Sequence, residues 1–591
     1  MSHPAWRWMF PGLCGLFGLA ACTAPTGPAP AAVPSPAPVT AVAASVEARL
    51  AHMSVEQKIA QLMVIGFDGV NYDVGLREMV EHYQVGGVIL FARNVESPAQ
   101  VATLTNQLQA SARKAGSPGL LVAIDQEGGR VARLTADKGF TEFPGAMALG
   151  ATARDIAVAA DNVRRAGEAM AAEMRAVGIN TDFAPDLDVN NNPANPVIGI
   201  RSFSSDPVRV ARLGTAFLEG LQGGGVLAFG KHFPGHGDTG TDSHLDLPVV
   251  RHSRARLNAV EFVPFKAAIA AHVAGIMSAH VSFPTIDDTP GLPGTLSSKV
   301  LTGLLRDELH FDGLVATDSL EMGALGRSGF PAPRAAARAL HAGADLLLFN
   351  AGFQLHQAAI AQIAADIRAG TIPLARLDEA VRRVLRAKER FGLTQPAPAD
   401  PANAAVICAA PAHRALAARL AVESVSLLRD PAARLPLAKS ARPIVIAVPA
   451  GVKLAALLGG SEVKVADTPT EREVAAALAA VRARRDAPVI ITLAGANTNR
   501  RQTELAQKII ATGASVILVA LREPYDLMAL AGDPAARTAP TLVATYGSNP
   551  PGTLPALAAV LRGETKPAGH LPVELPGLLP LGAGMDAFVQ R

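Results

Sequence analysis

Short apolar runs alternate with longer helical stretches from residue 46 onward, and most of the runs end in polar or glycine-rich residues. Short apolar runs bounded by turn residues predict buried strands. Eight such runs lie at residues 62–67, 87–91, 120–124, 179–185, 225–229, 275–280, 314–317 and 344–349. Alanine-rich stretches such as 155–177 and 208–221 predict helices between them. The pattern predicts a (β/α)8 barrel, with functional residues on loops at the carboxyl ends of the strands, and a distorted barrel also fits because the second run is weak. A doubly wound open sheet is the alternative.

A proline-rich segment near residues 395–405 marks a domain boundary, which assigns residues 46–400 to the barrel and 401–591 to a second domain. Ser54 and Gln57, like Thr470 and Glu473, have the spacing of a capping box and predict helix starts. The second domain is expected to be a smaller α/β sandwich with a mostly parallel sheet. Its predicted elements are a helix at 413–428 and strands at 444–448, 489–493, 516–521 and 542–546.

The first residues have the composition of an export signal. Arg7 precedes a short apolar stretch, and Leu19-Ala20-Ala21 leads to Cys22. This stretch is too short to span a bilayer and predicts a cleaved signal peptide over residues 1–21. The sequence before Cys22 resembles a bacterial lipobox, in which the cysteine is lipidated; an ordinary signal with a chance cysteine is the alternative. Residues 22–45 are rich in alanine and proline and predict an extended tether.

Cysteine content and charge narrow the possible functions. The three cysteines are Cys14, Cys22 and Cys408, so cleavage and lipidation would leave Cys408 alone, without an intramolecular disulfide. The 54 basic and 51 acidic residues give a net charge of +3, and no basic run of the kind that binds nucleic acid is present. The composition predicts an exported protein that attaches to a membrane only through its lipid and does not bind nucleic acid.

The densest group of titratable residues runs from Lys231 to His244 and directly follows a predicted strand. Its glycines and proline predict a long loop, and it contains three histidines. Asp242, two residues before His244, suits an aspartate that orients an imidazole for acid/base catalysis. A metal site and a purely structural loop are the alternatives, although no His-x-x-x-His or paired-cysteine spacing supports zinc.

Three further segments place charged residues at predicted strand ends. Asp318 follows the run at 314–317, where a helix cap formed with Glu321 is an alternative to a catalytic carboxylate. Asp125 precedes a glycine turn and Arg133, an arrangement suited to binding sugar hydroxyls, with a solvated turn as the alternative. Arg201 lies on another loop after a strand, which is a weak signal by itself.

Together these segments resemble glycoside hydrolase family 3, in its β-N-acetylglucosaminidase branch. The resemblance covers the chain from about residue 46 to its end, and Lys-His-Phe-Pro-Gly-His-Gly-Asp-Thr followed by Asp-Ser-His is its most specific part. It implies that Asp318 is the nucleophile and that His244, assisted by Asp242, is the acid/base. It also implies that N-acetylglucosamine is held by five residues: Asp125, Arg133, Arg201, Lys231 and His232. No role is transferred to His236, Asp238, Asp186 or Asp188.

The expected activity is retaining hydrolysis of terminal β-linked N-acetylglucosamine from peptidoglycan fragments or related oligosaccharides, without metal or organic cofactor. The β-glucosidase branch takes a glutamate acid/base from its second domain, and no such motif is found here. The expected location is the periplasm or cell envelope of a bacterium. Phosphorolysis in place of hydrolysis, a catalytically silent carbohydrate-binding lipoprotein and a metallohydrolase are the alternatives.

Overall fold

The computed structural model of this protein describes residues 39–590, apart from residues 351, 531, 533, 535–537 and 548–551. The described residues form one compact unit. The expected signal peptide, Cys14, the proposed lipidation residue Cys22 and most of the expected tether lie outside the described residues. Those expectations therefore stay predictions.

The first sheet has eight parallel strands in the order β7-β6-β5-β4-β3-β2-β1-β8. They are β1 (Met63–Ile65), β2 (Gly87–Leu90), β3 (Leu121–Ile124), β4 (Thr181–Asp182), β5 (Leu227–Phe233), β6 (Gly275–Ser278), β7 (Leu314–Thr317) and β8 (Leu347–Phe349). A parallel bridge between Ala316 and Leu346 joins the two ends of this order, so the barrel is nearly closed. The predicted barrel is confirmed, and its distortion lies at this seam and at the two-residue β4. Regular pairing covers only residues 181–182 of the strand predicted at 179–185. Single backbone hydrogen bonds continue beyond it, from the Phe183 N–H to the Ile124 carbonyl and from the Phe229 N–H to the Ala184 carbonyl.

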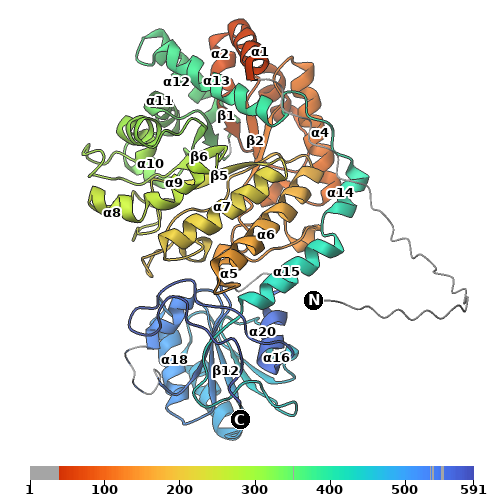
Figure 1. Ribbon diagram of the computed structural model, residues 1–591, viewed down its shortest axis with the longest axis vertical. Helices are drawn as coiled ribbons and strands as arrows, with labels where there is room; N and C mark the ends of the chain where they lie inside the picture. The colour runs from red at the N-terminus through yellow and green to blue at the C-terminus, as the bar shows by residue number, and fades with distance from the viewer. Residues whose placement is uncertain are drawn as a thin grey trace, which may run out of the picture. The chain divides into compact units, whose positions relative to one another are not determined.

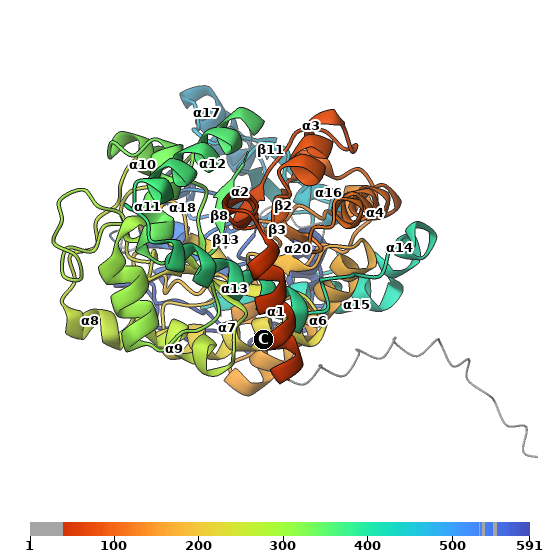
Figure 2. The same ribbon diagram turned by 90° about the horizontal axis from the view of Figure 1, so that it is seen from above.

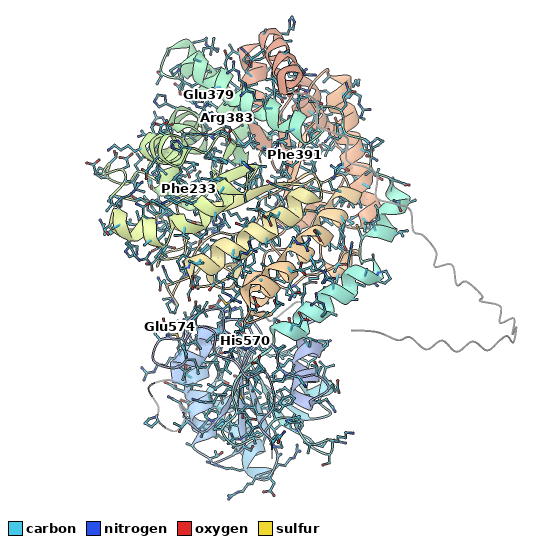
Figure 3. All side chains as sticks on the ribbon, viewed as in Figure 1. Phe233, Glu379, Arg383, Phe391, His570 and Glu574 are labelled. Atoms are coloured by element: carbon cyan, nitrogen blue, oxygen red, sulfur yellow. The ribbon has the colours of Figure 1, made fainter. Side chains whose placement is uncertain are left out.

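Helices surround the strands (Figures 1 and 2). The longer ones are α4 (Pro98–Lys114), α6 (Ile156–Ala176), α7 (Pro207–Gly223), α9 (Phe262–Ala270), α11 (Ala332–Ala342), α12 (Phe353–Arg368) and α13 (Leu374–Arg390). α4 and α7 begin with proline at the first helical position after a capping Ser97 or Asp206. The predicted capping box at Ser54 is present and begins α2 (Val55–Ala60). These capping residues and prolines determine where the three helices begin.

Helix α1 (Val39–His52) begins inside the segment that the sequence predicted to be an extended tether. The prediction over residues 22–45 is therefore wrong for residues 39–45. The last proline of that segment is Pro38, and alanine and valine after it allow a helix. Val46 and Leu50 are buried, and α1 packs against α13, which stabilises the helix.

The second sheet has six strands in the order β11-β10-β12-β13-β14-β9, and only the β14–β9 pair is antiparallel. The predicted strands correspond to β10 (Ile444–Ala447), β12 (Val489–Leu493), β13 (Val516–Ala520) and β14 (Thr541–Ala544). Helices α15 (Pro411–Ser424), α16 (Leu454–Leu457), α17 (Glu471–Ala483), α18 (Arg500–Ile510) and α20 (Thr553–Arg562) complete the predicted sandwich, and α17 begins with the capping box predicted at Thr470.

Two edge strands of this sheet were not predicted. The helix expected over 413–428 ends at Ser424, and β9 (Ser426–Arg429) follows it, so that prediction was too long. The apolar residues of β9 pair with β14, which overrides their compatibility with a helix. β11 (Ser461–Lys464) is mostly exposed and polar, and therefore lacks the apolar signal of a buried strand.

The barrel and the sandwich share buried contacts. Met147 and Ala148 of α5 (Ala146–Ala151) belong to the apolar core of the sandwich, and the Asn190 side chain donates to the Tyr525 hydroxyl at 2.8 Å. α14 (Pro401–Ile407) packs on α4 and α6, and α15 packs on α5 and α20. Together α14 and α15 form the one described stretch that is apolar and long enough to cross a membrane, but it is interrupted after residue 407 and packs on the protein.

Candidate active site

The side chains expected to form the site come from the carboxyl ends of neighbouring barrel strands. Asp125 follows β3, Lys231 and His232 lie in the last part of β5, and Asp318 follows β7. Arg201 ends a short 3-10 turn in the loop after β4 (Gly199–Arg201). Because all these strands are parallel, their carboxyl ends open on the same face of the barrel. The fold therefore brings residues from distant segments to one face.

Asp318 is half-buried and its carboxylate is held in the ionised form. Its Oδ1 accepts from the Ser319 N–H at 2.7 Å. Burial alone would raise its pKa, but the positive charges of His280 and His232, this hydrogen bond and the charge of His244 together hold the pKa below its usual value. No helix starts at Asp318, because α10 (Gly323–Arg327) begins five residues later with Met322 as its cap. The capping alternative is thereby excluded.

Asp242 and His244 form a hydrogen-bonded pair on an exposed loop. The Asp242 Oδ1 lies 2.7 Å from His244 Nδ1 and also accepts from the His244 N–H at 2.9 Å. Burial works against the charge of Asp242, but the hydrogen bonds from His244 outweigh it and lower the pKa of this carboxyl. The His244 side chain is 61% exposed, so its Nε2 is open to a ligand. An ionised aspartate on Nδ1 leaves Nε2 as the atom that exchanges a proton.

The loop that carries this pair is attached to the segment that follows Asp318. The Ala324 N–H donates to the Ser243 carbonyl at 3.2 Å. Gly323 lies so close to the loop that an added Cβ would be 2.5 Å from the His244 carbonyl oxygen. Asp318 and His244 also interact electrostatically, since the charge of His244 is one of those that lower the pKa of Asp318. The structure therefore brings the predicted nucleophile and acid/base together.

A buried ion-pair network joins most of the predicted sugar-binding residues. Lys231 Nζ lies 2.9 Å from Asp125 Oδ1 and 2.7 Å from Glu127 Oε1. Arg201 makes a two-pronged contact with Glu127, with distances of 2.9 and 2.8 Å. Arg133 Nη2 lies 3.6 Å from Asp125 Oδ2. Burial opposes these charges, but the opposite partners lower the pKa of Glu127 and raise those of Lys231 and Arg201. The network fixes the two cations at the base of the site.

His232 is oriented by a second buried acidic pair. Its Nδ1 lies 2.7 Å from Asp188 Oδ2, and its Nε2 lies 3.4 Å from Arg201 Nη2. Burial and the neighbouring Asp188 raise the pKa of Asp186 well above its usual value, whereas hydrogen bonding to His232 lowers that of Asp188 despite burial. One of the two aspartates therefore stays ionised and fixes the ring of His232.

Several residues of the site received no role from the sequence. Four such residues contact the sugar-binding residues or the segment of the nucleophile: Glu127, Asp186, Asp188 and His280. His280 Nε2 donates to the carbonyl of Ser319, the residue after Asp318, at 2.9 Å. The available signal for the three acidic residues was their position near strand ends beside the assigned residues. Their contacts depend on side chains far away in the sequence.

Two groups of described residues have ligand atoms close enough for a metal ion, namely Asp186, Asp188 and His232, and Asp238, His252 and Glu261. In the first group Arg201 Nη2 lies 3.7 Å from Asp186. In the second, Arg256 lies 2.7 Å from Glu261 and 3.9 Å from Asp238. A cationic side chain thus already lies beside a carboxylate of each group, which disfavours binding of a further cation.

A family profile described as the N-terminal domain of glycosyl hydrolase family 3 matches residues 54–387. The chain belongs to glycosyl hydrolase family 3. It is 36% identical to β-hexosaminidase A of Pseudoalteromonas piscicida over 406 aligned residues. This alignment covers 65% of this chain and 65% of the relative. It is also 32% identical over 571 residues to a β-N-acetylglucosaminidase/β-glucosidase of Cellulomonas fimi, covering 90% of this chain and 95% of the relative.

A solved structure of a family 3 β-N-acetylglucosaminidase from Paenibacillus sp. str. FPU-7 has the same fold. It superimposes with a TM-score of 0.80 at 36% identity and covers 89% of this chain and 100% of its own. This family member therefore lies in the β-N-acetylhexosaminidase branch. The resemblance inferred from the motifs is confirmed at this level.

Proposed function

We propose that this family 3 member is a retaining exo-β-N-acetylglucosaminidase that hydrolyses terminal β-linked N-acetylglucosamine from peptidoglycan fragments or related oligosaccharides. The observation that carries the proposal is the pairing of an ionised Asp318 with an aspartate-bound imidazole on a loop attached beside it. A retaining glycosidase needs a carboxylate on one side of the anomeric carbon and a proton donor at the leaving oxygen.

In the first step, an Asp318 carboxylate oxygen attacks the anomeric carbon and forms the glycosyl ester. The bond to the leaving oxygen breaks, and that oxygen takes the proton from His244 Nε2. In the second step, the neutral imidazole removes a proton from water, and the water oxygen displaces Asp318 from the anomeric carbon. Asp242, on Nδ1, stabilises the imidazolium in each cycle. The product keeps the β configuration because two displacements occur at one carbon.

Five residues are proposed to hold the sugar: Asp125, Arg133, Arg201, Lys231 and His232. Asp125 and Arg133 are partly exposed, and their side chains offer a carboxylate and a guanidinium to sugar hydroxyls. Lys231, Arg201 and His232 are nearly buried and fixed by Glu127 and Asp188, so they are preorganised before substrate binds.

Turnover of 4-nitrophenyl N-acetyl-β-glucosaminide, compared with the β-glucoside and with the Asp318→Ala variant, tests the activity. We expect wild-type turnover of the N-acetylglucosaminide and none by the variant. Absence of wild-type turnover, or turnover by the variant at the wild-type rate, would contradict the proposal. Product analysis on muropeptides and chitooligosaccharides then identifies the substrate class, and N-acetylglucosamine 1-phosphate formed in phosphate buffer would show phosphorolysis.

Export and lipid anchoring at Cys22 are part of the proposal, supported by the apolar segment and the lipobox-like sequence. Peptidoglycan fragments are the substrate expected at that location. Full-length protein should fractionate with bacterial membranes, and Cys22→Ser should move it to the soluble fraction. A soluble wild-type protein would contradict the anchor without affecting the hydrolase proposal.

A further inference from the structure

Ser243 lies between the two members of the proposed acid/base pair but faces the opposite way. Asp242 is partly exposed and His244 is largely exposed, whereas Ser243 is buried with 2% of its surface accessible. Its Oγ lies 2.9 Å from Nε2 of His236, which is equally buried. Its carbonyl accepts from Ala324, near Asp318. Ser243 is thus the point at which the exposed loop enters the protein interior.

His236 is itself held by a set of short contacts. Its N–H donates to Asp188 Oδ1 at 2.6 Å, and its Nδ1 lies 2.7 Å from Thr239 Oγ1. Its carbonyl accepts from the Asn195 side chain at 2.9 Å. Asp188 also binds His232, so the loop is anchored on the same buried acidic pair as the sugar-binding site.

The hydrogen-bond count assigns the tautomer of His236. The Thr239 hydroxyl has one proton and donates it to the His236 carbonyl at 3.0 Å. The same oxygen then accepts from Nδ1–H, which leaves Nε2 as an acceptor for the Ser243 hydroxyl. Burial lowers the pKa of His236 to about 4, so the ring is neutral near neutral pH. The two histidines of this loop therefore differ: His244 faces the solvent, and His236 is a fixed internal acceptor.

We propose that Ser243 and His236 are positioning residues, whose hydrogen bond holds the Asp242–His244 pair above the leaving-group oxygen. The inference rests on the proposed acid/base role of that pair. Without the Ser243–His236 bond, the part of the loop at residues 242–244 keeps its contact with Ala324 but loses its side-chain link to the buried His236. His244 Nε2 is then displaced from the leaving oxygen, while Asp318 and the sugar-binding residues stay in place.

The test compares Ser243→Ala with Thr241→Ala, a matched control that removes an exposed hydroxyl from the same loop. kcat/KM reports the first chemical step, in which only poor leaving groups need protonation. We expect Ser243→Ala to lower kcat/KM about 10- to 100-fold for a disaccharide and less than about threefold for an activated aryl glycoside. Thr241→Ala should change neither value. Equal losses on both substrates, or no loss on the disaccharide, would overturn the proposal.

A double-mutant cycle tests whether the serine acts through His236. If it does, adding His236→Gln to Ser243→Ala should cost little more than the worse single change, whereas additive losses would contradict the link. Amide hydrogen exchange gives a readout that is independent of catalysis. Ser243→Ala should exchange faster than wild type over residues 239–246 and Thr241→Ala should not; unchanged exchange in Ser243→Ala would refute the anchor. An inactive wild-type enzyme with the expected exchange pattern would refute the proposed function alone.

Discussion

Replacing Glu127 by glutamine tests the buried network beneath the site. The Glu127 carboxylate accepts two hydrogen bonds from Arg201, at 2.9 and 2.8 Å, and lies 2.7 Å from Lys231 Nζ. Glutamine keeps one acceptor oxygen, but its amide group would face a cationic donor. Two buried cations would then lose the charge that stabilises them.

The expected loss of stability follows from the burial of Glu127, Arg201 and Lys231, whose side chains are between 3% and 10% exposed. Removing one partner from a buried ion pair costs about 3–5 kcal/mol. We expect Glu127→Gln to lower the free energy of unfolding by this amount in urea denaturation. We also expect kcat/KM to fall at least about tenfold, equivalent to about 1.4 kcal/mol, as Arg201 and Lys231 shift.

Glu168→Gln is the matched control, because Glu168 pairs with Arg164 on an exposed helix face. An exposed pair of this kind contributes up to about 1 kcal/mol, and activity should stay unchanged. If the free energy of unfolding of Glu127→Gln lies within about 1 kcal/mol of the wild-type value and its kcat/KM is unchanged, the network is not needed to preorganise the site.

Three further changes test the catalytic loop and the core. His244→Ala should lower kcat/KM by about 10²–10⁴-fold for poor leaving groups and far less for good ones; equal losses would contradict its role as proton donor. Gly323→Ala places a Cβ 2.5 Å from the His244 carbonyl and should show the same selectivity, whereas Gly326→Ala, with nothing within 4 Å, should be neutral in the same assay. Burial lowers the pKa of Lys388 to about 7, against about 10.4 when unfolded, so stability should rise with pH between these values. Lys388→Met should raise Tm at pH 7. In thermal scans between pH 7 and 10, its Tm should increase less with pH than that of the wild type, because the contribution of Lys388 is gone. A variant with the same pH dependence as the wild type would contradict this prediction.

The barrel was predictable because most of its strands are buried, largely apolar runs, so the sequence pattern and the fold agree there. The strand of residues 87–90 and the helix of residues 156–176 lie within or beside their predicted ranges. The edge strand of residues 461–464 was not predictable, since its side chains are mostly exposed and its pairing comes from a distant strand. Helix α1 was missed because its stability comes from packing against α13, far away in the sequence.

The site was predictable where the chemistry is local. Asp242 and His244 are two residues apart, and their hydrogen bond follows from that spacing. Glu127 was not assigned because its partner Arg201 lies 74 residues further along the chain, and only the folded barrel brings them together. The sequence likewise did not predict that His236 supports the loop. Which of the two histidines is buried and which is exposed follows only from the folded structure.

The most direct test of the account is mass spectrometry of the trapped glycosyl-enzyme. A slow, activated fluorinated N-acetylglucosaminyl substrate is incubated with the enzyme, which is then digested and sequenced. We predict that one sugar is attached through the carboxylate of Asp318, in the peptide that follows β7. A label on any other residue would contradict the proposed catalytic centre, as would release of the α-anomer without a covalent intermediate.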